Sequence, residues 1–320
     1  MSVAALVAAV LLGWTAPAAT QQTQDEPTTL PEVEVTRQRT AEAVRSFVGQ
    51  VAAPAMGRGL AYWHVEICPG VANLDPLAAQ QIVDRITAVA ADLDLRTGEP
   101  GCNPNLVILF TNDGTGLAQG LVERDRKIFR QNAPGLDRGT AAFRDFQTSD
   151  RPVRWWSLSA AFDEETGIRA FRLPGDQVGM HVDSRIAQLL GCEVDDCPIG
   201  AAPILNRTTS SRVRSYTVDN LYKTIIIVDL DRIGAVDTGR LGDYLAFIGL
   251  AQVDVQADTT GYDTVLNLFS GGGETGLTDW DRAYLHALYS PRPLSITARA
   301  QAGDIAGFMT RDVLTSRRAE

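Results

Sequence analysis

The chain has 320 residues, of which 45% are hydrophobic and 21% charged, and its formal net charge is −10 at pH 7. This composition is typical of a globular protein with enough apolar material for a sizeable core. The negative charge argues against a nucleic-acid partner, because proteins that bind phosphate backbones present a basic face to them.

The first residues have the pattern of an export signal. Residues 3–14 are almost wholly apolar, and the Ala-Pro-Ala at 16–18 is the small-x-small pattern that signal peptidase accepts. The apolar run is too short for a bilayer-spanning helix, which needs ~20 apolar residues. We therefore expect a signal peptide over 1–19, a linker over 20–58 that holds one short helix at 41–51, and a periplasmic or secreted protein without a transmembrane segment.

A single α/β domain is expected over 59–320. Residues 63–68 alternate between apolar and polar side chains, as a strand does, and 105–111 form a second, mostly apolar strand. Between them an Asp-Pro pair opens a helix over 75–93. A strand, a crossover helix and a strand in this order predict a βαβ unit with parallel pairing.

The middle of the chain has poor periodicity. A helix is expected over 113–132, an edge hairpin is expected from strands at 151–156 and 168–173, and a further strand is expected at 212–218. The region 134–214 as a whole is interpreted as an irregular insert. Long inserts of this kind in a compact domain are usually functional or mobile.

The C-terminal part of the chain carries the functional argument. The β-branched run at 224–229 predicts a strand buried on both faces. It is followed by an amphipathic helix over 238–252, an apolar segment at 264–269 and a second helix over 277–289. A last helix is expected at 303–314.

This order of elements resembles the end of a metzincin-type zinc peptidase domain, whose first helix carries H-E-x-x-H-x-x-G-x-x-H and is followed by a methionine turn. Aligned on Gly249, the ligand and base positions are occupied by Gly242, Asp243, Ala246 and Gln252. Leu266 stands at the turn. A catalytic zinc needs about three His, Cys or carboxylate ligands, which Gly and Ala cannot supply. The resemblance implies an α/β (α+β) fold with a mixed, partly parallel sheet, packed helices and a metzincin-like core, but without metal or cofactor.

The whole chain also resembles an uncharacterised family of exported bacterial proteins, through its Trp-His-Val-x-x-Cys-Pro segment at 63–69 and its core helix. Membership of that family implies no activity.

Two kinds of function fit these observations. The first is a non-catalytic exported domain that binds a peptide, glycan or protein partner in the cleft of the former peptidase. The candidate cleft residues are Gly242, Asp243, Ala246, Gln252, Leu266 and His64. The second is a hydrolase with an unrecognised site around His64, Asp243, Asp254 and Asp258. We favour the first, because the positions expected to hold the metal lack the His ligands of the family and no G-x-S-x-G or Walker loop is present.

The four cysteines of an exported chain predict two disulfides. Cys192 and Cys197 are close in sequence, and Cys68 and Cys102 lie where the two predicted strands share one end of the sheet. A zinc site using Cys192 and Cys197 is the alternative, since a four-residue spacer lies at the edge of the ligand range. The histidines at 64, 181 and 286 have no metal-binding spacing, so no metal site is predicted.

Overall fold

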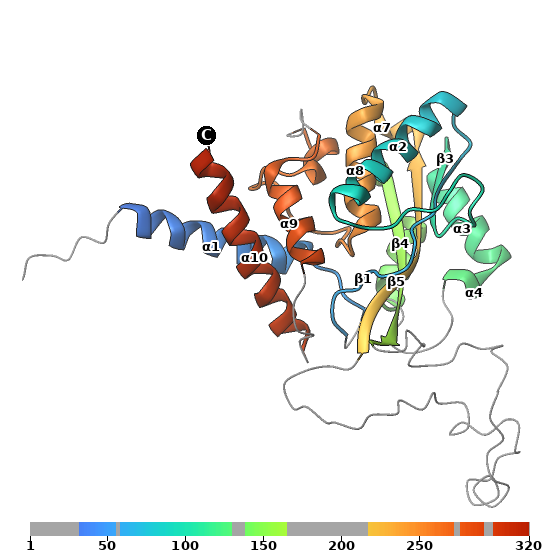
Figure 1. Cartoon of the computed structure of the whole chain (residues 1–320). Helices are drawn as coiled ribbons and strands as arrows, with labels where there is room; N and C mark the ends of the chain where they lie inside the picture. The colour runs from blue at the N-terminus through green and yellow to red at the C-terminus, as the bar shows by residue number, and fades with distance from the viewer. Residues whose placement is uncertain are drawn as a thin grey trace, which may run out of the picture.

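The computed structural model describes residues 32–55, 58–129, 138–164, 217–271, 276–290 and 297–319. The predicted signal peptide, the expected strand at 168–173 and the Cys192–Cys197 pair lie outside these residues. The fold is α/β, with a mostly parallel five-stranded sheet between two layers of helices (Figure 1). No helix among the described residues is long and apolar enough to cross a bilayer.

The sheet is organised around its last strand. The strands are β1 (Tyr62–Trp63), β2 (Pro69–Ala72), β3 (Leu106–Thr111), β4 (Val153–Asp163) and β5 (Thr217–Asp229). On one side, β5 pairs in parallel with β1 near its amino end and with β3 along its carboxyl half, and β2 lies beyond β3. On the other side, β5 pairs with β4, which is antiparallel.

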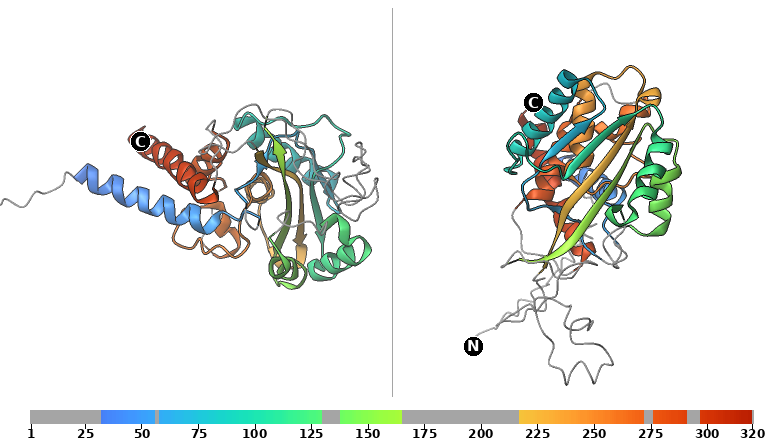
Figure 2. Two further views of the ribbon diagram at one scale, coloured as in Figure 1. Left: turned by 90° about the horizontal axis from the view of Figure 1, so that it is seen from below. Right: turned by 90° about the vertical axis from the view of Figure 1, so that its right-hand side faces the viewer.

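Helices cover both faces of this sheet (Figure 2). They are α1 (Glu32–Val51), α2 (Pro76–Asp92), α3 (Gly114–Arg124), α4 (Arg126–Phe129), α5 (Thr140–Thr148), α7 (Leu230–Ile233), α8 (Thr238–Leu250), α9 (Asp279–Tyr289) and α10 (Ala298–Ala319), with a 3-10 helix η1 (Val265–Phe269). Helices α3, α4 and α5 cover one face, whereas α2 and α8 cover the other. Helices α9, α1 and α10 pack together beyond α8.

The β-branched run of β5 is buried on both faces, as predicted. Successive side chains of a strand point to opposite faces. Ile226 and Val228 therefore pack in the large core with α8, and Ile225 and Ile227 pack in a smaller core with α3, α4 and α5. An unbroken apolar run can form a central strand only because both faces are covered.

The predicted βαβ unit is confirmed, but its first strand is displaced. Asp75 caps α2 by accepting from the backbone of Leu77 at 3.0 Å, and Pro76 occupies the first turn. The strand expected at 63–68 is wrong: β1 ends at Trp63 and β2 begins at Pro69. The physical reason is that β1 pairs with β5 whereas β2 pairs with β3, so the chain between them crosses to the far edge of the sheet.

Two further differences concern the middle of the chain. The region 134–214 is not irregular throughout, because α5 and β4 lie within it. The strand expected at 151–156 is present and longer, and its described partner is β5. Strand β5 itself joins the segments expected at 212–218 and 224–229 into one strand from Thr217 onwards.

The terminal helices are longer than expected, and one internal helix is shorter. Helix α1 begins at Glu32, within the predicted linker, and α10 extends from Ala298 to Ala319. The helix expected at 113–132 is interrupted at Asp125, which ends α3.

The predicted disulfide between Cys68 and Cys102 is confirmed, with Cα atoms 6.0 Å apart. It joins the start of β2 to the loop before β3. A Cβ at Gly98 would lie 2.7 Å from the Sγ of Cys102, so the bridge fits only against a glycine. The bond closes a loop with a sequence separation of 34 residues.

We expect the double variant Cys68→Ser, Cys102→Ser to unfold with a free energy about 3–4 kcal/mol lower than the parent, because the unfolded chain gains the freedom of the opened loop. Urea unfolding of both proteins under non-reducing conditions measures this difference. Equal midpoints and slopes would show that the bridge does not constrain the unfolded chain.

Candidate functional site

Helix α8 holds three of the positions singled out by the resemblance to zinc peptidases: Gly242, Asp243 and Ala246. Asp237 caps it by accepting from the backbone of Gly239 at 2.9 Å and of Arg240 at 3.1 Å. Every residue from Leu241 to Leu250 is buried. A helix buried on all sides lies inside the core and presents no open face to a ligand.

Gly242, at the first ligand position, is a contact between two helices. A Cβ on this residue would lie 3.1 Å from both Cβ and Cγ of Arg85 and 3.9 Å from the Cα of Ile82. Helix α2 therefore approaches α8 directly at this glycine. Ala246, one turn further on, is fully buried in the large core. The space that a pair of metal-binding histidines would need is filled by packed protein.

Asp243, at the position of the catalytic base, is held by its neighbours. Its carboxylate forms an ion pair with Arg85 of α2 and accepts from the backbone of Leu277 at 3.1 Å. Its side chain is only 8% exposed. Asp243 therefore ties α8 to α2 and to the segment that leads into α9, and both of its oxygens are occupied.

The other three candidate residues lie in different places. Gln252 is buried and accepts from the backbone of Ala61 at 2.7 Å. Leu266 lies in η1, which packs against α8, as expected of a turn below this helix. His64 lies beside β1, with its ring 4.3 Å from that of Tyr62. Partial burial lowers the pKa of His64, and the nearby Glu164 opposes that shift.

The six residues therefore do not line one common cleft. Gly242 and Asp243 face α2, and Ala246 belongs to the large core. His64 lies near the amino end of β5, where β1 pairs with that strand.

The turn after α8 is fixed by Asp281 of α9, a role that the sequence pattern did not reveal. The carboxylate of Asp281 accepts from the hydroxyl of Thr264 and from the backbone of Val265 at 2.7 Å. It also forms a capping box with Thr278 at the start of α9. Burial raises the pKa of Asp281 to about 6, although the hydrogen bonds from Thr264, Val265 and Thr278 oppose the shift.

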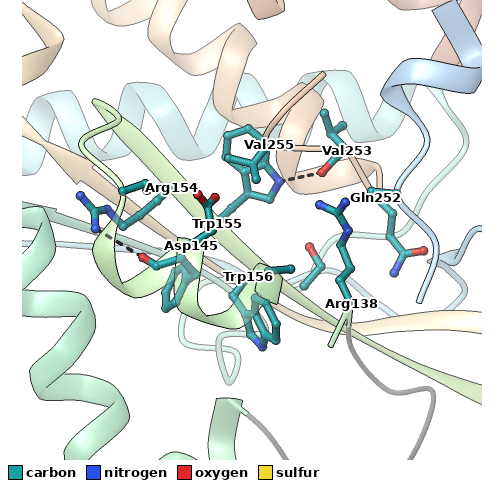
Figure 3. Close-up of a pocket in the computed structure, with 13 residues that line it drawn as sticks. Arg138, Asp145, Arg154, Trp155, Trp156, Gln252, Val253 and Val255 are labelled. Carbon is teal, nitrogen blue, oxygen red and sulfur yellow. Dashed lines mark hydrogen bonds between the residues drawn. The ribbon is translucent and has the colours of Figure 1, made fainter. Parts of the chain in front are cut away.

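A groove runs along the outer side of β4, and we call it the edge groove (Figure 3). Its floor is formed by the β4 residues Arg154, Trp155, Trp156 and Ser157. One wall is formed by Ala142, Asp145, Phe146 and Ser149, in and just after α5, and the other by Ala53, Gln252, Val253 and Val255. The indole of Trp155 donates to the carbonyl of Val253 at 3.0 Å and so fixes the second wall to the floor.

A second, more open hollow adjoins the edge groove at Trp155 and Val255, which line both. Its other apolar side chains are those of Pro152, Val153, Tyr244, Ala257, Leu266 and Phe269, and its charged ones are Arg151 and Asp258. Thr260 lowers the pKa of Asp258 by hydrogen bonding to the carboxylate. The described lining of the two hollows includes no histidine or cysteine, so it supplies no nucleophile paired with an imidazole base.

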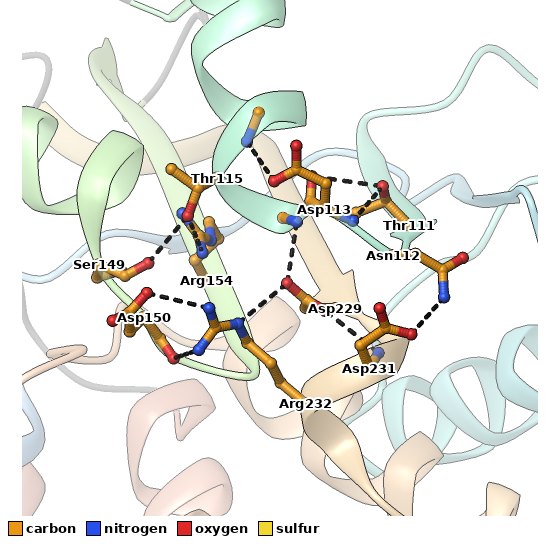
Figure 4. A network of polar contacts seen from close by, with 12 residues as sticks. Thr111, Asn112, Asp113, Thr115, Ser149, Asp150, Arg154, Asp229, Asp231 and Arg232 are labelled. Atoms are coloured by element: carbon orange, nitrogen blue, oxygen red, sulfur yellow. Dashed lines mark hydrogen bonds and ion pairs between the residues drawn. The ribbon is translucent and has the colours of Figure 1, made fainter.

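Polar side chains also gather where β3 and β5 end side by side (Figure 4). The Asp229 carboxylate accepts from the backbone of Gly114 at 2.9 Å and pairs with Arg232 at 3.3 Å. Arg154 is 1% exposed and donates to Thr115 at 3.1 Å and to the carbonyl of Phe146 at 3.3 Å. Burial lowers the pKa of Arg154, and Asp229 opposes this.

These contacts join the starts of α3 and β4 to the end of β5. In open α/β sheets such a position, where neighbouring strands send their helices to opposite faces, is a common ligand site. Here the side chains are engaged mainly with one another. The described residues contain no group of three or more His, Cys, Asp or Glu side chains placed to hold a metal ion.

Comparisons of the chain with protein-family models, with curated proteins and with solved structures find no match.

We expect Gly242→His to lower the free energy of unfolding by about 2–3 kcal/mol, because the new side chain must separate α2 from α8. Gly120→His in α3 is the matched control, since a Cβ there meets nothing within 4 Å. The control should stay within about 0.5 kcal/mol of the parent. Thermal and urea unfolding test both variants, and equal stability of the two would refute close packing at Gly242.

The buried carboxyl of Asp281 predicts an unusual pH dependence. Its pKa of about 6 in the folded protein exceeds the unfolded value of 3.8, so its contribution to stability is largest below pH 3.8 and is lost as the pH rises through about 6. The full effect is roughly 3 kcal/mol.

Asp281→Asn should abolish this part of the pH dependence, because an amide of the same shape can accept from Val265 and donate to Thr264. Asp281→Ala should cost up to about 3 kcal/mol at low pH, because buried donors lose their acceptor, and less at pH 7.5, where the parent has itself lost the contribution of Asp281. Urea unfolding of the parent and both variants at pH 4.5 and pH 7.5 separates these effects. An unchanged pH profile in Asp281→Asn would contradict the assignment.

Proposed function

We propose that this chain is a non-catalytic exported domain with a metzincin-like core that binds a peptide or protein segment in the edge groove and the adjoining hollow. The observation that carries the proposal is the closed packing at Gly242 and Asp243. Where a zinc peptidase needs an open metal site, α2 fills the space and Arg85 neutralises the carboxylate. Catalysis through that helix has neither ligands nor room.

The order of the C-terminal elements supports the scaffold part of the proposal. Strand β5 leads into α8, η1 follows and packs against α8, and α9 completes the series. Asp281 secures the turn to the last helix, which gives η1 a fixed position below α8.

The lining of the edge groove favours a polypeptide over a glycan. Both walls present aliphatic and aromatic side chains, among them Phe146, Val253 and Val255, and the floor is β4, which lies at the edge of the sheet formed by the described strands. Such a surface offers backbone pairing and apolar contact, which is how sheet edges recognise extended peptides. The disulfide between Cys68 and Cys102 supports export, because such bonds persist in oxidising compartments.

The hydrolase alternative has less support from the geometry. Of its four residues, Asp243 is paired with Arg85, and Asp254 forms a two-pronged ion pair with Arg138. His64 lies beside Tyr62 and is not among the residues lining either hollow.

Fluorescein-labelled casein, an unfolded polypeptide, tests the proposal. We expect its fluorescence anisotropy to rise on addition of the protein without the appearance of fragments, with or without added zinc. Metal analysis after dialysis should find far less than one zinc per chain. Stoichiometric zinc, or cleavage that a chelator stops, would contradict a non-catalytic role.

A further inference from the structure

The outer side of β4 presents backbone groups that the sheet does not use. Among the described strands, β4 pairs with β5 alone. The backbone of Asp229 donates to the carbonyl of Pro152 at 2.8 Å, which marks these two residues as a hydrogen-bonded pair. Because such pairs alternate along an antiparallel ladder, Arg154 and Trp156 also bond to β5.

By the same alternation, the backbone groups of the residues between these hydrogen-bonded pairs point to the outer side of β4. The N–H and C=O groups of Trp155 and Ser157 point away from β5, and both residues line the edge groove. The two walls flank this stretch, which limits lateral association of whole sheets there. A single extended chain can pair with backbone groups in such a position.

We propose that the edge groove binds an uncharged, extended segment of small apolar residues, which adds to the sheet as a strand beside β4. This rests on the proposed function and names its site and ligand class. The incoming strand would pair with the backbone of Trp155 and Ser157. Its side chains would alternate between the wall at Phe146 and the wall at Val253.

The size and charge of the groove set the chemistry of the ligand. The space between its two walls is narrow, which favours small side chains. The charges at its rim are balanced in pairs: Arg138 with Asp254, and Arg151 with Asp145. A charged ligand would compete with these side chains for their ion-pair partners, whereas an apolar one is matched by the aliphatic side chains of the walls.

The ion pair between Arg138 and Asp254 joins the two walls across the groove. Arg138 precedes α5, and Asp254 follows Val253, with hydrogen bonds of 3.0 and 2.6 Å between them. Entry of a strand must displace this contact. Asp254→Asn should therefore increase peptide affinity by about two- to five-fold, which is the range for a partly exposed pair.

The test uses the peptide acetyl-Ser-Val-Ala-Val-Thr-amide and amide hydrogen exchange of the full chain, followed by NMR. We expect added protection at the amides of Trp155 and Ser157. The amides of Arg154 and Trp156 should not change, because they already bond to β5. Protection without this alternation, or protection elsewhere only, would overturn the proposal.

Two variants at one position provide the matched comparison. Ser157→Pro removes the outward N–H, whereas Ser157→Ala keeps it; both lose the hydroxyl that contacts Thr224. We expect Ser157→Ala to bind the peptide as the parent does and Ser157→Pro to bind at least ~10-fold more weakly, as loss of a buried backbone partner implies. Equal affinity of the two folded variants would overturn the proposal.

If Ser157→Pro fails to fold, strand pairing can be tested by changing the peptide instead of the protein. Two N-methylated peptides, one methylated at the central Ala and the other at both Val residues, block opposite edges of the added strand. One should lose binding and the other keep it, and equal binding by both would refute strand addition. Cleavage of the unmethylated peptide would instead refute the non-catalytic function. The hydrogen-exchange pattern of the β4 amides would still test whether the peptide binds in the edge groove.

Discussion

The backbone pairing of β5 is the constraint on which the rest of the structure depends. This strand bonds to β1 and β3 on one side and to β4 on the other, so three of the other four strands pair with it directly. The side chains of its run from Ile225 to Val228 are apolar on both faces, which obliges helices to cover both. The chain therefore sends α3 to α5 to one face and α2 with α8 to the other, and the two cores share only this strand layer.

The closed state of α8 follows from that arrangement. The helix must lie flat on the sheet, and Gly249 allows this because a Cβ there would lie 3.0 Å from the side chain of Leu106 of β3. It must also pack beside α2, and Gly242 allows that contact. Asp243 is then drawn into the interface and is stabilised by Arg85. The small residue at an aligned ligand position, Gly242, and the nearby Gly249 are here required by the close approach of α8 to α2 and β3.

The sequence predicts those parts of the fold whose signals are local. Helix α2 has a capping Asp and a following Pro, and β3 and the carboxyl half of β5 have β-branched runs that no helix pattern fits. The split between β1 and β2 could not be predicted, because it depends on which distant strand each segment joins. The same holds for α5, which begins after Gly139, where φ is 89° and no side chain caps the helix.

The candidate site was harder to predict than the fold. A glycine in a helix is compatible with an empty cleft and with a close helix contact, and only the position of Arg85 distinguishes them. The edge groove is formed by residues from α5, β4 and the segment after α8, which are distant in sequence and carry no shared motif. The groups proposed to bind the ligand belong to the backbone of β4, and backbone groups leave no signature in residue identity.

The position of β5 late in the chain has a consequence for folding. Strands β1 and β3 both pair with a strand that ends at residue 229, and β4 must wait for the same partner. Contacts of such long sequence separation slow folding, because the chain loses loop entropy before it gains them. Until β5 is made, the inner edge of β3 has no partner in the sheet. A growing chain of this sequence is thus most exposed to wrong pairing just before its central strand is synthesised.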